Sequence, residues 1–447
     1  MQIKLPEDVK FIIDRLKNAG YDAYAVGGCV RDSLLGRTPN DWDITTSAKP
    51  EETKALFSRT IDTGIQHGTV TVMLHRNGYE VTTYRVDGEY EDSRHPKEVT
   101  FTVDLTEDLK RRDFTINAMA YNETAGLVDV FGGAEDLKNG VVRCVGNAEE
   151  RFDEDALRIM RAVRFSAQLG FVMEEKTKAA IRIYAPRLQK VSAERIQVEL
   201  TKLVESPNPD YLRVAWETGI TAEILPEFDR LMQLPQNNPH HCYSAGQHTL
   251  HAMKAIAGNA GGRADKYLVL AALFHDFGKA ACRTTDEKGI DHFYGHAEIS
   301  AQMAKQILKR LRYDNDTIDK VSWLVQWHDM EIQPEKKAVR RAVSKIGREC
   351  FVPLLCLKQA DLDAQSSYGK EEKPSWLDKL YIIYEEICRD QDCLSLKELA
   401  VNGRDLIQAG VRPGPALGEV LSGMLELVLE EPSRNTKEYL LSTLEQG

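Results

Sequence analysis

The spacing of apolar and polar positions changes near residue 147 of the 447-residue chain. Before that point, short runs rich in β-branched and aromatic residues alternate with turn signals such as GG, RNG and DG, which predicts strands. After it, apolar residues recur every three or four positions, as in segments 154–169 and 192–204, which is the helix period. The expected strands cover residues 22–26, 41–46, 69–74, 79–85 and 126–131.

These patterns predict an α+β protein, in which a small mixed α/β head is followed by all-helical parts. A stretch rich in Pro, Asn and Gly at 233–246 is the best linker candidate. We expect a head at 1–146, a helical neck and body at 147–232, a second helical domain at 247–385 and a helical tail at 386–447.

Composition excludes several classes of protein. The chain has 58 Lys and Arg against 69 Asp and Glu, a net charge of −11, so any nucleic-acid contact needs a local basic patch. No stretch approaches the roughly 18 apolar residues of a membrane span, and the N-terminus lacks the pattern of a secretory signal. The eight cysteines are scattered without a close CxxC pair, which indicates reduced thiols. We therefore expect a cytoplasmic protein without a membrane partner, whose oligomeric state stays open.

The most informative motif is an aspartate pair in segment 26–47. On the predicted strand, Asp41 and Asp43 are two residues apart and point to the same face. Adjacent carboxylates repel each other unless a cation lies between them, and hard oxygen ligands beside substrate phosphates suit Mg²⁺. The pattern therefore fits metal-assisted phosphoryl transfer, in which the cation lowers the pKa of an attacking hydroxyl.

A diglycine precedes this pair and strengthens the interpretation. Gly27 and Gly28 stand before a predicted helix start, where backbone without side chains lets a triphosphate approach amide N–H groups. Arg31 lies one turn into that helix and is placed to contact the same oxygens. An isolated D-x-D is common by chance in exposed turns, but GG-x-x-RD followed nine residues after Asp32 by D-x-D is far more specific.

As a set, five motifs resemble the class II tRNA nucleotidyltransferases, or CCA-adding enzymes, and the related bacterial poly(A) polymerases. The motifs are GGCVRDSLLGRTPNDWD (27–43), DTGIQHGTVTV (62–72), TTYRVDGEYEDSRHPKEVTF (82–101), RRDFTINAMAYN (111–122) and EDALRIMRAVRF (154–165). The resemblance covers residues 5–230 almost without a break, and it implies addition of CCA to the 3′ end of tRNA from CTP and ATP, with Mg²⁺. It also implies that Asp41 and Asp43 hold the metals and that the diglycine and Arg31 bind the triphosphate.

Two motifs are expected to position and read the nucleotide. Arg112, in segment 111–122, is expected to fork onto phosphate oxygens, whereas the roles of Asp113 and Asn117 are less defined. Asp155 and Arg158 are three residues apart and hence neighbours on a helix. A carboxylate beside a guanidinium offers an acceptor and a donor to the edge of C or A, and the resemblance implies that this pair selects the base without a template. The alternative is an ordinary surface ion pair.

Positive charge continues along the same segments. Arg161 and Arg164 follow at three-residue steps and are expected to form a basic stripe towards the phosphates. A basic run follows, which either grips tRNA phosphates or is only a solvated face: Lys176, Lys178, Arg182, Arg187, Lys190 and Arg195.

Two further features bear on the head. Glu80 is a third, weaker candidate for a metal-binding carboxylate. Family members that add the terminal A carry a flexible loop near segment 87–96, which is intact here and favours full CCA addition over CC-only addition. That loop contains Glu89, Glu91, Asp92 and Arg94.

The second helical domain carries residues in the order H…HD…D, namely His248, His275, Asp276 and Asp361. Imidazole and carboxylate ligands from separate helices can converge on a divalent transition metal, whose bound water is a nucleophile near neutral pH. The pattern resembles the HD phosphohydrolase superfamily, which implies a transition metal (Ni, Mn, Fe or Co) and hydrolysis of RNA 2′,3′-cyclic or terminal phosphates. His296 and His328 are candidates for a second metal and Lys279 for a phosphate contact. The alternative is a degenerate domain that only packs against tRNA.

The leading hypothesis is therefore CCA addition to tRNA. Within the same class of enzyme, the alternatives are CC-only addition and poly(A) addition. Outside it, the alternatives are an HD phosphohydrolase whose N-terminal half only binds RNA, and a tRNA-binding chaperone without catalysis.

Overall fold

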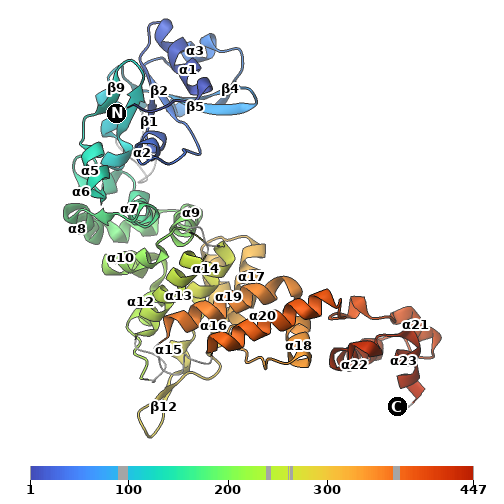
Figure 1. The fold of residues 1–447 in the computed structure, drawn as a ribbon. Coiled ribbons are helices and arrows are strands. Elements are labelled where there is room, and N and C mark those ends of the chain that lie inside the picture. Colours follow the sequence, from blue (N-terminus) through green and yellow to red (C-terminus); the bar gives the residue numbers. More distant parts are fainter. Residues whose placement is uncertain are drawn as a thin grey trace. The chain divides into compact units, whose positions relative to one another are not determined.

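The computed structural model describes residues 2–88, 99–237, 243–259, 261, 265–365 and 373–445 (Figure 1). The chain forms two compact units, Met1–Asp229 and Arg230–Gly447. The first unit contains a large sheet with helices, and the second is helical apart from one short strand pair in its described part. The expected α+β class is confirmed. Among the described helices, none combines the length and the apolar character that crossing a bilayer requires.

The described part of the first unit is built on a seven-stranded sheet with the order β3-β4-β5-β2-β1-β8-β9. Strands β2 and β5 run parallel, and the other neighbours in this sheet are antiparallel. A separate antiparallel pair joins β6 to β7, and a short parallel pair joins β10 to β11. The strands are β1 Ala23–Val26, β2 Ile44–Thr46, β3 Thr60–Gly64, β4 Thr69–Leu74, β5 Asn77–Thr83, β6 Arg85–Asp87, β7 Val99–Phe101, β8 Met119–Asn122, β9 Gly126–Asp129, β10 Val141–Val142 and β11 Val172–Met173.

One predicted strand changes at the aspartate pair. The strand expected at 41–46 begins only at Ile44, so Asp41 and Asp43 lie in the loop that leads into β2. The three residues of β2 are buried, whereas both aspartates are exposed. Strand alternation therefore does not set the direction of the two carboxylates, and the prediction that they share a strand face is wrong.

Helices cover the sheet and continue to the end of the first unit. The helix α7 was expected to begin at residue 154, but Asp155 has extended backbone (φ −141°, ψ 104°) and separates α6 from α7. Gly170, with a positive φ, ends α7 in the manner typical of helix C-termini. The helices are α1 Glu7–Asn18, α2 Gly28–Leu34, α3 Pro50–Leu56, α4 Leu105–Lys110, α5 Gly133–Asn139, α6 Ala148–Glu154, α7 Leu157–Leu169, α8 Glu175–Tyr184, α9 Ala193–Val204, α10 Leu212–Glu217, α11 Ile220–Ile224 and α12 Pro226–Met232, which contains the boundary between the units.

The second unit packs its helices around α14, whose residues from Val269 to Phe274 are all buried. Helices α13, α16, α17 and α19 contact α14. Near the C-terminus, Leu406, Met424, Val428 and Leu440 belong to a separate small core. The elements are α13 Ala245–Asn259, α14 Lys266–Phe274, α15 Lys279–Cys282, β12 Thr284–Thr285, β13 Asp291–His292, α16 His296–Arg310, α17 Asn315–Trp327, α18 Lys336–Ile346, α19 Arg348–Ala364, α20 Lys373–Arg389, α21 Gly403–Gln408, α22 Pro415–Glu430 and α23 Lys437–Ser442.

Candidate functional site

Three carboxylates gather at one side of the large sheet. Asp43 and Glu80, which stands on β5, line a common cavity of about 220 Å³. Partial desolvation raises the pKa of Asp43, which Arg112 opposes and Asp41 reinforces. Desolvation, followed by the charges of Asp43 and Asp41, raises the pKa of Glu80. The three carboxylates therefore lie close enough to repel one another, and their oxygen-only donor set fits Mg²⁺.

Backbone contacts fix the loop that carries the aspartates. The carbonyl of Asp43 accepts a hydrogen bond of 2.9 Å from the backbone amide of Val26, at the end of β1. The thiol of Cys29 lies 3.9 Å from the same carbonyl. Burial raises the pKa of Cys29 to about 11, so this thiol is neutral and acts as a packing group. The aspartate loop is thereby tied to the turn between β1 and α2.

The diglycine forms that turn. Gly27 has φ +82° and precedes α2, which begins at Gly28. A Cβ atom built on Gly27 would lie 3.0 Å from Nη1 of Arg112, and one on Gly28 would lie 3.7 Å from Nη2 of Arg31. Glycine is needed at position 27 both for its backbone conformation and for the approach of the guanidinium. The structure thus brings together the diglycine and the two arginines that the sequence predicted.

Arg31 is held by three neighbours. Its guanidinium donates to both oxygens of Asp32, at 2.9 and 3.0 Å, and to Oδ1 of Asn117 at 2.7 Å. It also lies 5.2 Å from the centre of the Phe165 ring. Asn117 in turn donates to Asp113 at 3.2 Å. Asn117 therefore positions Arg31, a role that the sequence left undefined.

Asp108, which the sequence did not single out, contacts two arginines of the site. This fully buried carboxylate accepts hydrogen bonds from Arg111 at 2.9 and 2.8 Å and from Thr45 at 3.1 Å, and Arg112 lies 3.5 Å away. Burial opposes ionisation, but the two arginines lower the pKa of Asp108 overall. The spacing of three and four residues before Arg111 and Arg112 was the available signal, because such residues are neighbours on a helix.

The same arginine pair joins two cavities. Arg111 and Arg112 line the cavity of the carboxylates and also a second cavity of about 260 Å³. Nε of Arg112 is buried and has no hydrogen-bond partner among the described residues. The second cavity is lined by Arg111, Arg112, Asp113, Asp155, Leu157, Arg158, Arg161 and Arg195. Asp155 and Arg158 therefore share their cavity with the two arginines that also line the cavity of Asp43 and Glu80.

Asp155 and Arg158 are each fixed by other groups. Oδ1 of Asp155 accepts from the backbone amide of Leu157, the first residue of α7, at 3.0 Å, and Oδ2 accepts from Arg195 at 2.8 Å. Arg158 donates to the carbonyls of Arg151, at 3.2 Å, and of Arg111, at 3.0 Å. Asp155 thus precedes the helix instead of lying within it, but both side chains still line one cavity.

The expected basic stripe divides into two parts. Arg161 lines the second cavity, but its Nε and Nη2 atoms donate to Oδ2 of Asp113 at 2.8 and 2.6 Å. Arg164 is only 6% exposed and pairs with Glu199 and Gln168. The lining of the cavities described above does not include Arg164, so the expectation that it extends the stripe towards the phosphates is corrected.

Two further predictions concern the polar loop of the head and the basic run that follows α7. The loop residues Glu89, Glu91, Asp92 and Arg94 lie outside the described residues. Of the basic run at 176–195, three members form ion pairs, which reduces the charge left for phosphates. These pairs are Lys178 with Glu217, Arg187 with Asp153, and Arg195 with Asp155.

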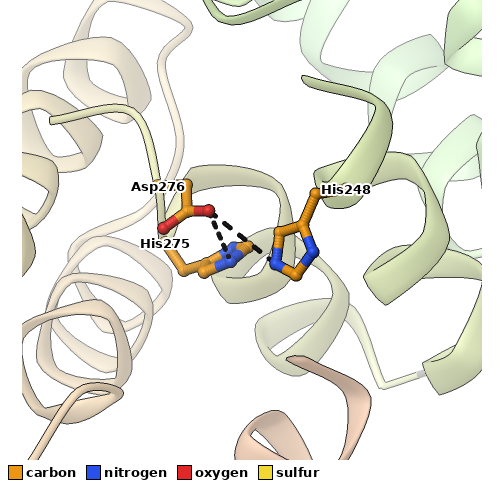
Figure 2. A group of neighbouring side chains, drawn as sticks. All are labelled: His248, His275 and Asp276. Carbon is orange, nitrogen blue, oxygen red and sulfur yellow. Dashed lines mark ion pairs between the residues drawn. The ribbon is translucent and has the colours of Figure 1, made fainter. Parts of the chain in front are cut away.

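A second cluster lies in the helical unit (Figure 2), where His248, on α13, and the His275–Asp276 pair, directly after α14, come together. Nε2 of His248 lies 3.8 Å, and Nε2 of His275 3.2 Å, from Oδ2 of Asp276. Asp361, on α19, completes the group, since its Oδ1 lies 2.7 Å from Nε2 of His248 and 3.5 Å from Nε2 of His275. The structure thus brings together the four predicted ligands.

The histidines share an orientation that suits metal binding. Nδ1 of His275 lies 2.7 Å from the carbonyl oxygen of Ala272. Nδ1 of His296 lies 2.8 Å from the carbonyl oxygen of Phe293, and Nδ1 of His328 lies 2.7 Å from that of Val325. A carbonyl accepts only, so Nδ1 is the donor in these three rings, and Nε2 faces the other groups of the cluster. Nε2 of His275 is buried without a hydrogen-bond partner in the described part of the chain. These imidazoles fit a transition metal.

Asp276 belongs to two potential ligand groups. One contains His248 and His275, and the other contains His296 and His328. Oδ1 of Asp276 lies 3.5 Å from Nε2 of His296, which in turn lies 3.1 Å from Nε2 of His328. Lys279 is buried and contacts Oδ2 of Asp276 and Oε1 of Gln236, both at 2.8 Å, so its amine already has two partners.

The fold and the first site define a nucleotidyltransferase. The model of the Poly A polymerase head domain matches residues 23–143, which include the carboxylates, the diglycine and Arg112. A model of an RNA and SrmB-binding site of polymerase A matches residues 170–232, and a model of tRNA nucleotidyltransferase domain 2 matches residues 283–444. These three ranges leave out His248, His275 and Asp276.

Curated relatives match along nearly the whole chain. A CCA-adding enzyme of Limosilactobacillus reuteri is 35% identical over 445 residues, which cover 98% of this chain and 96% of that protein. A CCA-adding enzyme of Latilactobacillus sakei is 37% identical over 443 residues, covering 96% and 95%. The chain belongs to the family of CCA-adding enzymes.

Solved structures agree with this assignment. The crystal structure of the Bacillus stearothermophilus CCA-adding enzyme in complex with CTP matches with a TM-score of 0.76 and 32% identity, covering 99% of this chain and 98% of that chain. The Thermotoga maritima CCA-adding enzyme complexed with tRNA_CCA matches with a TM-score of 0.62, covering all of both chains, and at 21% identity it shows the fold alone.

Proposed function

We propose that this chain adds CCA to the 3′ end of tRNA from CTP and ATP, without a nucleic-acid template, through Asp41 and Asp43. One observation carries the proposal. Arg111 and Arg112 line both the cavity that contains Asp43 and Glu80 and the cavity that contains Asp155 and Arg158. A nucleotide whose phosphates lie against these arginines has the carboxylates on one side and the base-reading pair on the other.

Each group has a role in this reaction. Asp41 and Asp43 hold Mg²⁺, with Glu80 beside them. When bound, Mg²⁺ lowers the pKa of the RNA 3′-hydroxyl and neutralises charge on the leaving pyrophosphate. Arg31 and Arg112 bind the triphosphate, since guanidinium groups fork onto phosphate oxygens.

Several neighbours of these arginines act by positioning. Asp32 and Asn117 hold Arg31, and Asp108 holds Arg111 beside Arg112. A held guanidinium loses less conformational entropy when the triphosphate binds. Gly27 leaves room for Arg112 to approach the turn.

Base choice follows from the shared chemistry of C and A. Both bases present an exocyclic amine donor and a ring-nitrogen acceptor on the pairing edge. The Asp155 carboxylate accepts from the amine and the Arg158 guanidinium donates to the ring nitrogen. U and G present the opposite pattern and are rejected, because a buried donor or acceptor would stay unpaired.

The number of added nucleotides distinguishes CCA addition from CC-only addition and poly(A) addition. A tRNA that ends in CC is incubated with ATP alone, and the product is resolved on a sequencing gel. CCA addition gives one added A, CC-only addition gives none, and poly(A) addition gives many. A tRNA that lacks CCA, given both CTP and ATP, is expected to gain three nucleotides.

We also propose a second activity, a transition-metal phosphohydrolase that acts on 2′,3′-cyclic or terminal phosphates of RNA. It is supported by the convergence of Nε2 of the buried His248 and His275 with the buried Asp276 and the partly exposed Asp361. These four residues would hold the metal (Ni, Mn, Fe or Co), which would supply an activated water when bound.

The second activity is tested with the metal-loaded full chain. Release of phosphate, or opening of a cyclic phosphate, is measured with Ni²⁺, Mn²⁺, Fe²⁺ and Co²⁺ in turn. His275→Ala is expected to abolish hydrolysis and to leave CCA addition intact, whereas Asp41→Ala has the reverse effect. Hydrolysis that persists in His275→Ala would contradict the assignment.

We further propose that the protein works in the cytoplasm. The cysteines of the described part of the chain are free thiols, which fits a reducing compartment. Cell fractionation with an antibody to the chain tests this location.

A further inference from the structure

One exposed aromatic ring beside the His/Asp cluster has no part in the proposals above. Tyr294 lies between β13 and α16 and lines a cavity of about 610 Å³, together with Asp276, His296, His328 and Asp361. It is 80% exposed. A ring so exposed at the wall of a cavity contributes little to the core, and its surface is open to a ligand.

The ring is nevertheless held in a defined orientation. Tyr294 stacks on His292, with ring centres 5.4 Å apart and planes 5° apart. The His292 ring is itself fixed, because its Nε2 lies 3.1 Å from Oδ2 of Asp286. The two rings therefore form a flat, supported surface at the edge of the cavity.

A tight turn connects this surface to the candidate metal ligands. Gly295, with φ +75°, follows Tyr294, and His296 begins α16. The carbonyl of Phe293 accepts from both the backbone amide of His296, at 3.2 Å, and its Nδ1, at 2.8 Å. Two residues span at most about 7 Å of backbone. The Cα atoms of Tyr294 and His296 therefore lie within about 7 Å of each other, and both side chains line the same cavity as Asp276 and Asp361.

We propose that Tyr294, backed by His292, is the stacking platform for the base of a nucleoside phosphate whose phosphate is bound at the His/Asp cluster. This inference rests on the proposed phosphohydrolase function and names a specificity residue for it. Every base has a π-face, so the platform accepts all four bases. It discriminates against phosphate esters that carry no base.

Kinetics with matched substrates test the platform. The metal-loaded full chain is assayed with adenosine and uridine 2′,3′-cyclic phosphates and with the base-free methyl riboside 2′,3′-cyclic phosphate. Loss of one base–aromatic stack corresponds to a rise of roughly 5- to 150-fold in KM. Tyr294→Ala is expected to show this rise for both nucleoside phosphates, with kcat and the base-free ester unchanged. Tyr294→Trp is expected to keep the low KM.

Two controls separate the platform from general damage. Tyr439→Ala removes another exposed tyrosine, in α23, and is expected to leave every KM unchanged. CCA addition is expected to be the same in the wild type and in Tyr294→Ala. If Tyr294→Ala raises KM for the base-free ester by the same factor, or leaves KM for both nucleoside phosphates unchanged, the platform is refuted.

Failure of the phosphohydrolase proposal gives a different result. If the wild type hydrolyses none of the three esters with any of the four metals, the phosphohydrolase proposal is wrong. The platform is then tested by the binding of a nucleoside phosphate. Calorimetric titration of uridine 2′,3′-cyclic phosphate into the metal-loaded wild type and Tyr294→Ala then compares affinities. Weaker binding by Tyr294→Ala supports the platform, and equal binding, or no binding by either protein, overturns it.

Discussion

The two clusters contain the same acidic residue type in opposite surroundings. Asp43 is exposed, lies in a loop and shares its cavity with Glu80 and arginines. Asp276 is 1% exposed, follows a buried helix and is surrounded by imidazoles and Lys279. An exposed oxygen-only group leaves coordination positions for water and phosphates, which Mg²⁺ requires. A buried mixed nitrogen and oxygen group selects a transition metal instead.

The elements that hold these two groups of side chains also differ. In the first unit, a turn with a positive-φ glycine and a hydrogen bond between backbone groups hold the aspartate loop. In the second unit, the candidate ligands lie on α13 and α19 or directly after α14, and backbone carbonyls accept from the rings of His275 and His328. Backbone contacts of a loop thus hold the first group of carboxylates, whereas packed helices hold the second.

Substitution of Asp41 or Asp43 is expected to reduce nucleotide incorporation more than any other change. Asp41→Ala or Asp43→Ala should lower incorporation of both CTP and ATP by roughly 10³-fold or more, because a metal ion supplies several kcal/mol of transition-state stabilisation. Radiolabelled CTP or ATP and a trimmed tRNA provide the assay. Asp14→Ala, at an exposed position on α1, is the matched control and should stay active. A mutant at either aspartate that still extends tRNA would remove the proposed active site.

Metal exchange is expected to separate the clusters almost as sharply. After treatment with a chelator, Mg²⁺ should restore CCA addition but not hydrolysis, and a transition metal should restore hydrolysis, since the two donor sets differ in softness. Both activities are measured on one preparation across a series of metals. Identical metal profiles for the two activities would refute the contrast between the donor sets.

Base selection should change by a smaller factor. Asp155→Ala or Arg158→Ala is expected to reduce the preference for CTP and ATP over UTP and GTP by roughly 5- to 150-fold, because an unpaired buried polar group costs about 1–3 kcal/mol. The ratio of kcat/KM values for the four nucleotides measures it. Asp153→Ala, two residues from Asp155 and paired with Arg187, is the control. An unchanged ratio would assign base choice to other residues.

Removal of a buried charge should affect stability. Burial opposes ionisation, but Arg161 and its hydrogen bonds lower the pKa of Asp113 to about 2. A folded pKa below the unfolded value of about 3.9 stabilises the protein above that pH, and the contribution is lost as the pH falls towards 2. Asp113→Asn is expected to cost about 3 kcal/mol at pH 7 and to flatten this acid dependence. Urea unfolding between pH 7 and pH 2 measures the stability loss and its pH dependence. If the stability of the wild type and of Asp113→Asn changes equally with pH, the ion pair between Asp113 and Arg161 does not stabilise the fold.

Substitution of Gly27, in the turn between β1 and α2, is expected to have the smallest effect on nucleotide addition. Gly27→Ala places a Cβ atom 3.0 Å from Nη1 of Arg112 and strains a positive-φ position, at a cost of about 1–2 kcal/mol. KM for CTP should rise several-fold because Arg112 is displaced, and kcat should change less. Gly36→Ala, also at positive φ but with nothing within 4 Å of its Cβ, separates strain from displacement. Equal KM changes in both variants would assign the effect to strain.

Local signals predicted much of this structure. Strands at 22–26 and 69–74 and the helix at 192–204 were recovered within a residue or so, because alternation and the helix period are local properties. Strand β8 was not predicted. Its four residues are all buried, so it lacks alternation, and it lies inside a motif dominated by charged and polar residues.

Contacts between distant residues explain the remaining differences. Arg164 turns into the core because Glu199, 35 positions later, accepts from it, and no local pattern reveals that pair. The four His and Asp ligands were predicted from their order along the chain, but the carbonyls that orient their rings were not. The position of the aspartate pair ahead of β2 depends on its hydrogen bond to Val26, which is likewise non-local.

A crystal of the full chain with CTP and Mn²⁺, which substitutes for Mg²⁺ and scatters anomalously, tests the central claim most directly. We expect an anomalous peak coordinated by Asp41 and Asp43, a triphosphate against Arg31 and Arg112, and the cytosine edge facing Asp155. Bound CTP with no metal at the two aspartates, or with its base in a different cavity, would contradict it.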